Sequence, residues 1–252
     1  MPSTLGITAS GIGKDALNWN TVITADAPYG WWKLNETSGN LVNSGNSGAA
    51  NTTYGSTVGL TRNETGIATY SGNKAFSFNS TATTWSRLNV DLYGTNLGNA
   101  NANSFEMIFK ITNSNGRATL ARQRADALGW GLIAAVGTGT IRLLGWAKNI
   151  FDQGIEIDTG VAWDSNKWYH VVYTWAQTES KMYLNGNLIF TKTYASTTGT
   201  NDSTNNVDMF SSLSGAFDRS RDSIIDELVV YKTTLTPAQV MYHATASGVL
   251  YQ

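Results

Sequence analysis

The chain has 252 residues, 17 basic and 18 acidic side chains, a formal net charge of −1 and no cysteine. A chain of this length buries roughly 70 to 75% of its unfolded surface as one compact domain, so its core needs no disulfide. The balanced charge offers no basic field for nucleic acid or an anionic membrane, and the most apolar run, residues 128–136, is too short to span a bilayer.

The start of the chain differs from the rest. Residues 1–20 are punctuated by glycine and have no sustained hydrophobic period, which predicts an extended arm, with one domain over residues 21–252. Two interpretations of the arm are open: a floppy terminus, or an arm that docks on a neighbouring subunit and buries its apolar residues, Leu17 among them. This terminus also lacks a basic leader with an apolar core and therefore does not predict a secretory signal.

Short strands are predicted along most of the remaining chain, because apolar and polar residues alternate there. The predicted strands are 29–36, 75–79, 87–90, 104–112, 118–122, 130–136, 141–146, 168–175, 181–184, 188–190 and 223–231. Apolar residues at every second position predict that 104–112 is buried on one face only. Aromatic and β-branched residues on both faces of 168–175 predict a strand that is buried on both faces.

Local signals mark one hairpin and one helix. Asn185 and Gly186 stand between two apolar runs, and this dipeptide predicts a type I′ turn. Thr236, Pro237 and Gln239 predict the capping box and first turn of a short C-terminal helix. Strands at this spacing, joined by turns, predict an all-β antiparallel sandwich or jelly roll.

Three stretches also carry a family signature. They are ADAPYGWWKLNETSG at 25–39, WYHVVYTWAQTESKMYLNGNLIF at 168–190 and IDELVVYKTTLTPAQVMYHA at 225–244. In this order they resemble the laminin G-like branch of the concanavalin A-like lectin/glucanase superfamily. The resemblance implies a concanavalin A-like jelly roll with a short C-terminal helix, and it does not specify a ligand.

The same resemblance points to a cofactor. It implies that Glu36 and Asp226 lie near the edge of the sandwich, where relatives hold a structural ion. Unpaired carboxylates at a core margin are costly, and an oxygen-rich, turn-rich shell suits calcium. The alternative is that both carboxylates pair with Arg or Lys, or are solvated.

Catalysis is tested first on the acids, because some relatives are β-glucanases with paired carboxylates on one strand. Glu156 and Asp158 are the candidate pair, but Gly160 and Val161 occupy the positions where a further acid is expected. With two histidines and no cysteine, the sequence has few ligands for zinc and lacks the thiol of a Cys–His nucleophile. The sequence therefore predicts a protein that is not an enzyme.

Sugar recognition needs aromatic platforms beside polar groups in a concave site. Trp130 and Trp146 flank glycine-rich turns, and Arg122 and Asp126 lie nearby in the sequence. These four residues are the candidate ligand-binding site.

The expected function is a non-enzymatic phage virion surface protein, either a capsid decoration, a head fibre or a tail component, whose lectin-like domain binds glycans. This expectation rests on the missing signal and on the arm. The alternatives are a secreted, extracellular bacterial carbohydrate-binding module and a glycoside hydrolase. Expected partners are other virion proteins, further copies of the chain in a homo-oligomer, and surface glycans, without nucleic acid or membrane insertion.

Overall fold

The computed structural model describes residues 17–46, 60–78, 102–112, 116–123, 129–136, 139–148, 155–176, 179–193, 207–209 and 223–252. In chain order the elements are α1 (Trp19–Ala25), β1 (Gly30–Trp32), β2 (Leu60–Thr65), β3 (Lys74–Phe78), β4 (Ala102–Ile111), β5 (Gly116–Gln123), β6 (Gly129–Val136), β7 (Thr140–Lys148), β8 (Ile155–Ala162), β9 (Tyr169–Ala176), β10 (Glu179–Leu184), β11 (Asn187–Thr193), β12 (Val207–Met209), β13 (Ser223–Tyr231), α2 (Pro237–Ala246) and the 3₁₀ turn η4 (Val249–Tyr251).

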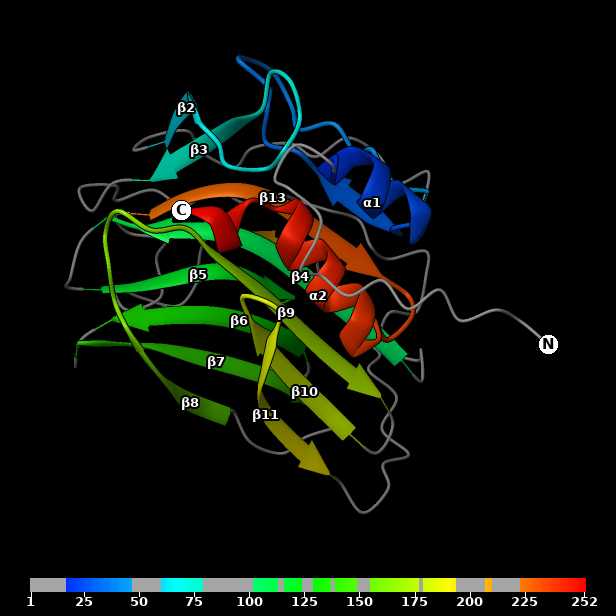
Figure 1. Cartoon of the computed structure of the whole chain (residues 1–252), viewed down its shortest axis with the longest axis vertical. Coiled ribbons are helices and arrows are strands. Elements are labelled where there is room, and N and C mark those ends of the chain that lie inside the picture. The colour runs from blue at the N-terminus through cyan, green and yellow to red at the C-terminus, as the bar shows by residue number, and fades with distance from the viewer. Residues whose placement is uncertain are drawn as a thin grey trace.

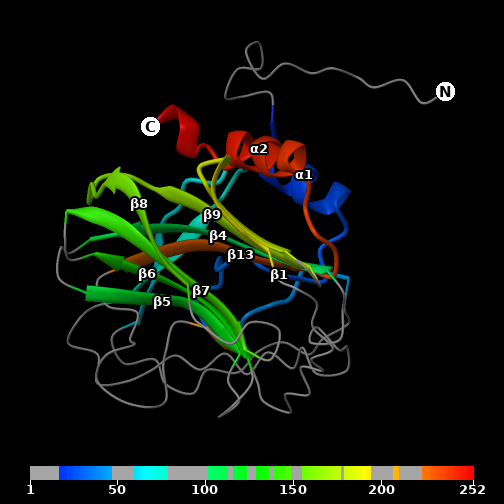
Figure 2. The same cartoon turned by 90° about the horizontal axis from the view of Figure 1, so that it is seen from below.

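The described strands form two antiparallel sheets (Figure 1). The larger sheet has the order β11-β10-β9-β4-β13-β3-β2, with β1 paired to β13, and the smaller sheet has the order β12-β5-β6-β7-β8. Figure 2 shows the strands of the smaller sheet stacked against one face of the larger sheet. The predicted antiparallel sandwich with a short C-terminal helix is therefore confirmed.

Apolar side chains fill the space between the two sheets. Ile141 and Leu143 of β7 and Ile157 of β8 share this core with residues of the larger sheet. Trp32 and Leu34 are fully buried in it.

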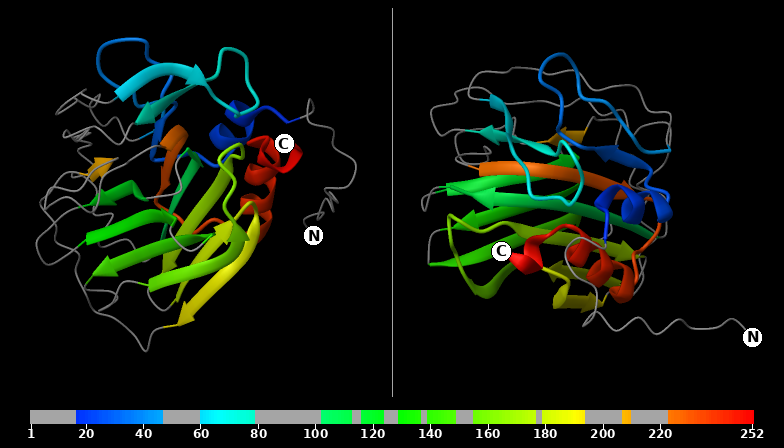
Figure 3. Two further views of the ribbon diagram at one scale, coloured as in Figure 1. Left: turned by 90° about the vertical axis from the view of Figure 1, so that its left-hand side faces the viewer. Right: turned by 45° about the horizontal axis from the view of Figure 1, so that its top comes forward.

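The outer face of the larger sheet is covered by α1 and α2, which lie side by side across it (Figure 3, right). Trp19 of α1 and Val240 of α2 pack there against Ile108 and Val229 of the sheet. The prediction that 104–112 is buried on one face only is therefore wrong, because the helices also cover Glu106 and Ile108, both 0% exposed. The prediction that 168–175 is buried on both faces is confirmed in β9.

The sequence did not predict α1. Asn18 caps this helix by accepting a hydrogen bond from the Thr21 amide at 3.2 Å, and Trp19 is fully buried in the outer core. Leu17 is also buried against its own domain. Packed structure thus begins within the range expected for the arm, and residues 1–16 lie outside the described residues.

The predicted turn and the predicted start of the C-terminal helix are both confirmed. Asn185 and Gly186 have φ angles of 50° and 81°, as a type I′ turn requires. Thr236 and Gln239 form the predicted capping box, with Pro237 in the first turn. The predicted strand at 87–90 lies outside the described residues, and in the part of the chain that is described no helix is long and apolar enough to cross a membrane.

Candidate functional site

A β-bulge in β13 places two consecutive acids inside the protein. Ile225 pairs with Phe109 and Glu227 pairs with Ile108, so Asp226 is the extra residue between two register positions. Both acids are 0% exposed. The central strand of the larger sheet thus carries two buried carboxyl groups at one point.

Asp226 holds the segment that joins β2 to β3. Its Oδ2 accepts hydrogen bonds from the Ile67 amide at 2.6 Å, from the Ala68 amide at 2.8 Å and from Asn73 Nδ2 at 2.8 Å. Burial raises the pKa of Asp226 to about 6, even though these three donors favour the charged form. This carboxyl fixes the two ends of residues 67–73.

Glu227 holds the middle of the same segment. Its Oε1 accepts a hydrogen bond from the Tyr70 hydroxyl at 2.7 Å, and its Oε2 accepts one from Trp31 Nε1 at 2.6 Å. Burial, together with the adjacent Asp226, raises the pKa of Glu227 well above its usual range. The bulge therefore anchors residues 67–73 from beneath through two side chains.

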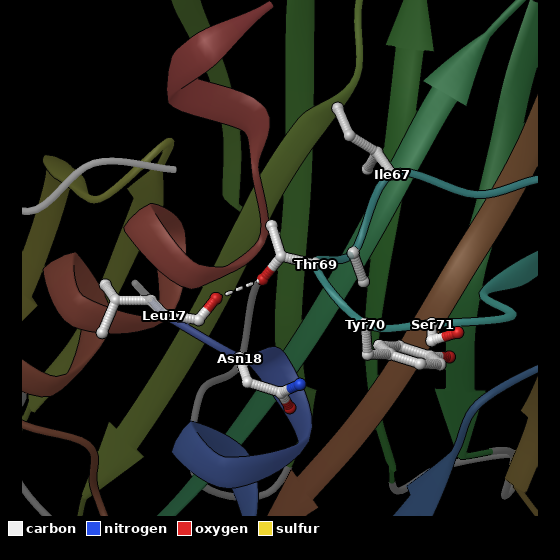
Figure 4. Close-up of a pocket in the computed structure, with 7 residues that line it drawn as sticks. Leu17, Asn18, Ile67, Thr69, Tyr70 and Ser71 are labelled. Atoms are coloured by element: carbon white, nitrogen blue, oxygen red, sulfur yellow. Dashed lines mark hydrogen bonds between the residues drawn. The ribbon is translucent and has the colours of Figure 1, made fainter. Parts of the chain in front are cut away.

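A pocket of about 410 Å³ lies beside this segment (Figure 4). Its lining is drawn from the start of α1 and from the anchored segment: Leu17, Asn18, Ile67, Ala68, Thr69, Tyr70 and Ser71. Thr69 Oγ1 lies 2.6 Å from the Leu17 carbonyl, a contact that is dashed in Figure 4, and 2.6 Å from the Ala246 carbonyl. The pocket wall is thus joined to both ends of the domain.

The expected calcium ligands lie on segments that touch. Glu36 Oε1 accepts a hydrogen bond from the Val42 amide at 2.8 Å. The neighbouring Asn35 accepts from the Lys74 amide at 2.7 Å, which places the loop of Glu36 beside the segment that Asp226 holds. Asp226 itself is not at a core margin but fully buried, because it belongs to the bulge of a central strand.

Some buried oxygen atoms in this region have no hydrogen-bond partner within the described structure. Glu36 Oε2, Asn73 Oδ1 and Asp226 Oδ1 are buried and make no hydrogen bond within the described structure. Carboxylate and amide oxygens are the ligands that calcium prefers. No group of three or more His, Cys, Asp or Glu residues in the described ranges could hold a metal ion, so a cation here would rest on two carboxylates and on amide oxygens.

The candidate sugar-binding residues are partly brought together by the smaller sheet, of which the backbone is described at these positions. Arg122 of β5 lies opposite Gly131 of β6, and Gly131 lies opposite Trp146 of β7. Trp130 follows one position along, opposite Ala147. Positions 122 and 146 therefore share one face at one end of three adjacent strands, whereas position 130, one residue along from Gly131, belongs to the opposite face of the sheet. Asp126 lies outside the described residues.

The candidate catalytic acids lie on the edge strand β8 of the smaller sheet. Asp158 is exposed and lies 3.8 Å from Arg142 Nε, and a hydrogen bond from the Gly160 amide lowers its pKa. A general acid needs a raised pKa, which Asp158 does not have. Glu156 lies opposite Leu144 in the sheet.

A second buried polar cluster lies beneath the two helices. His170 Nε2 lies 2.5 Å from Glu106 Oε1, His243 Nδ1 lies 3.0 Å from Glu106 Oε2, and the Tyr231 hydroxyl donates to Oε2 at 2.9 Å. His243 Nε2 lies 2.7 Å from Asp26 Oδ2. Glu106 and both histidines are 0% exposed, so this carboxylate–imidazole array is closed off from any substrate.

The charged groups of this cluster stabilise one another in their ionised forms. Burial alone lowers the pKa of His243, but the carboxylates of Glu106 and Asp26 outweigh burial and raise it to about 9. Burial alone would raise the pKa of Glu106, and the two histidines hold it well below its usual range. The hydrogen bond from His243 lowers the pKa of Asp26. The cluster joins α1 and α2 to β4, β9 and β13.

Fold and sequence together define a lectin-like jelly roll. A family model described as "Concanavalin A-like lectin/glucanases superfamily" matches residues 86–241. The chain belongs to this superfamily, within its laminin G-like branch, as the three sequence stretches indicated.

Solved structures agree on the fold, and 385 chains match. The botulinum neurotoxin serotype D binding domain has a TM-score of 0.60 at 16% identity and covers 88% of this chain and 52% of that chain. Domain 4 of AbnA, a GH43 extracellular arabinanase from Geobacillus stearothermophilus solved in complex with arabinotriose, has a TM-score of 0.60 at 19% identity and covers 86% and 98%. The binding domain of botulinum neurotoxin DC, solved with rat synaptotagmin II, has a TM-score of 0.53 at 14% identity and covers 88% and 52%.

This protein spans about half the length of the neurotoxin binding domains and nearly the whole arabinanase domain. At these identities the likeness shows the fold alone. No curated protein sequence matches the chain.

Proposed function

We propose that this protein is a non-enzymatic glycan-binding domain carried on the surface of a virion. One observation carries the glycan-binding part: this chain and a domain solved with arabinotriose cover one another over 86% and 98% of their lengths. Coverage of both chains means that the shared fold is a complete domain rather than a fragment. Because fold alone does not fix function, the binding itself needs a direct test.

The proposed binding residues are Arg122, Asp126, Trp130 and Trp146. An indole face stacks on the C–H face of a sugar, while a guanidinium and a carboxylate bind its hydroxyl groups. The backbone supports Arg122 and Trp146 as partners, because positions 122 and 146 share one face at one end of the smaller sheet, whereas position 130 lies on the opposite face.

A glycan array probed with the full chain tests the function, and Trp130→Ala and Trp146→Ala test the site. Trp146→Ala should lose about tenfold or more in affinity, because it removes the stacking platform that shares a face with Arg122, and Trp130→Ala, on the opposite face, should have the smaller effect. Asp158→Asn, an exposed change on β8, is the matched control and should bind like the parent protein. A silent array with folded, multivalent protein would argue against glycan binding, whereas unchanged affinity in both tryptophan variants would reject only the site.

Calcium is proposed as a structural cofactor. Glu36, Asn73 and Asp226 would hold it, since each has a buried oxygen without a hydrogen bond in the described structure. The ion would supply positive charge to a site where burial already disfavours an ionised Asp226.

The proposed absence of catalysis is supported by Gly160 and Val161, which stand where a further acid would be expected beside Glu156 and Asp158. Incubation of the protein with every glycan that it binds should give no shortened product. If product forms and Glu156→Gln abolishes it, the protein is a hydrolase.

The proposed place on a virion rests on the sequence of the N-terminal arm. We propose that residues 1–16 mediate the assembly of subunits. Deletion of these residues should leave the sandwich folded and lower the oligomeric state, measured by light scattering. An unchanged oligomeric state would reject the assembly role of the arm.

A secreted carbohydrate-binding module is the second candidate, favoured by the arabinanase domain, which belongs to an extracellular enzyme. Mass spectrometry of purified particles separates the two: the virion proposal requires peptides of this chain in the particle.

A further inference from the structure

The pocket beside α1 has a wall that is fixed before any ligand arrives. Residues 67–73 are anchored by the carboxyl groups of Asp226 and Glu227, and Thr69 contacts the carbonyls of both Leu17 and Ala246. A wall held in this way loses little conformational freedom when a ligand binds, which favours affinity.

The size of the pocket suits a small ligand. Its volume of about 410 Å³ is near the lower end of the range of about 300–1,000 Å³ for small-molecule sites. One or two sugar units, rather than a long chain, match a space of this size.

The chemistry of the lining selects a neutral, hydroxyl-bearing ligand. Ile67 offers apolar surface and Tyr70 an aromatic ring, both half-buried, while Leu17 and Ala68 are buried and no lining residue carries a charged side chain. The lining residues themselves offer no counter-charge to a charged ligand, and the Lys33 ammonium lies 5.7 Å from the centroid of the Tyr70 ring. A purely apolar ligand would leave the polar groups of the rim without partners.

Two polar side chains lie at the rim. Asn18 uses its Oδ1 to cap α1, which leaves its Nδ2 group to donate hydrogen bonds to a ligand. Figure 4 shows Asn18 on the α1 side and Ser71 beyond Tyr70 on the other side, and both residues are exposed. A sugar ring lying on the apolar wall would place its hydroxyl groups between them.

We propose that this pocket binds a neutral sugar unit, as a second glycan site distinct from the tryptophan positions of the smaller sheet. The proposal rests on glycan binding as the function of the domain, but it uses none of the residues assigned to the first site. Two sites on different faces would let one domain bind two units of a branched or crowded glycan surface.

Asn18→Asp is the discriminating variant. Aspartate caps a helix as well as asparagine does, so α1 is retained while the donor of the pocket becomes an acceptor. Ser71→Ala removes the second rim group at an exposed position. Asp158→Asn on β8 is the control, since it changes a carboxylate to an amide far from the pocket lining.

The experiment is a ¹H–¹⁵N NMR titration of the full chain with arabinotriose, maltotriose and a trimer of galacturonic acid. The amides of residues 67–71 should shift with at least one neutral trisaccharide and not with the acidic trimer. Asn18→Asp should weaken this binding about tenfold, the effect of one lost hydrogen bond and an added charge. Asp158→Asn should leave it unchanged.

The two glycan sites give different outcomes. Shifts confined to the region of residues 122, 131 and 146 would overturn the pocket proposal and leave the proposed function intact. An array hit that produces no shift at 67–71 would do the same, and equal binding of the acidic trimer would overturn the assignment to neutral sugars. A silent array together with shifts at 67–71 that Asn18→Asp abolishes would support the pocket and reject the first site.

Discussion

His243 Nε2 lies 2.7 Å from Asp26 Oδ2, and this contact joins helix α2 to the C-terminal end of helix α1. The other ring nitrogen of His243 faces Glu106 at 3.0 Å. A neutral imidazole has one N–H group, so only the protonated ring can donate to both carboxylates. A buried cation therefore connects the two helices to the larger sheet.

Removal of this cation should cost stability in a pH-dependent way. Since the pKa of His243 is raised from 6.5 to about 9, the protonated ring stabilises the fold fully below about pH 6.5, and this contribution is lost as the pH rises through 9. At about 1.4 kcal/mol per pKa unit the contribution is about 3 kcal/mol. His243→Gln should thus be less stable than the parent protein at neutral pH, and urea unfolding should show the gap closing above pH 9.

The comparison of two proteins matters here, because Asp226 and Glu227 also have raised pKa values and therefore also lose stability as the pH rises, in the same direction as His243. Their contribution is common to the parent and to His243→Gln and largely cancels in the difference. A difference in unfolding free energy that stays constant from neutral pH to beyond pH 9 would contradict the protonated ring.

A second variant separates the effects of Asp26 and Glu106 on the pKa of His243. Asp26→Asn keeps the shape of the side chain and removes one of the two negative charges beside His243, so the pKa of His243 should fall from about 9. The chain contains two histidines, so two sets of imidazole signals are expected by NMR, and His170→Gln assigns them. An unchanged titration of His243 in Asp26→Asn would show that Glu106 alone holds the proton.

Calcium should raise the melting temperature of the parent protein, and a chelator should lower it again. A ligand that binds only the folded state adds about 2.7 kcal/mol at a concentration of 100 times its Kd. Glu36→Gln should melt like the chelated parent protein and gain little from added calcium, because one of the buried carboxylate oxygens is replaced. A melting temperature that does not respond to calcium or chelator in the parent protein would rule the ion out.

Gly186 is predicted to be sensitive to alanine. Its φ angle is 81°, and an added Cβ would lie 2.9 Å from Met241 Sδ and 3.1 Å from the Ala244 Cβ of helix α2. The backbone conformation alone costs about 1–2 kcal/mol for a residue with a Cβ. Gly160→Ala is the matched control, since Gly160 has a φ angle of 67° but nothing within 4 Å of its Cβ position. Gly186→Ala should be the more destabilised of the two in urea unfolding. Equal losses of unfolding free energy would mean that helix α2 moves to accommodate the added Cβ without destabilising the protein.

Local signals in the sequence were reliable where the structure depends on neighbouring residues. Asn185-Gly186 determines its turn through backbone preference, and Thr236 and Gln239 determine a helix start through their own hydrogen bonds. Helix α1 escaped notice because it has seven residues and one cap, Asn18. It is stabilised by tertiary packing, with the Trp19 ring edge-on to both His170 and His243.

Long-range contacts account for what the sequence did not reveal. Glu106 stands at a polar position of an alternating strand, and only the helices that arrive from both ends of the chain bury it. The family resemblance identified Asp226, but its hydrogen-bond donors lie more than 150 residues earlier in the chain. The pocket was missed for the same reason, since residues 17–18 and 67–71 meet only after folding.

The contacts of Thr69 bear on how the domain could be attached to another chain. Its hydroxyl lies 2.6 Å from the carbonyls of both Leu17 and Ala246, so the first packed segment and the end of helix α2 lie side by side. Figure 2 shows α1, α2 and the C-terminus on the side of the domain away from strands β5, β6 and β7. A tether attached before residue 17 or after residue 252 would hold the domain in the same orientation, with the smaller sheet facing outward. Fusion at either end should therefore leave strands β5 to β8 equally accessible to a large glycan.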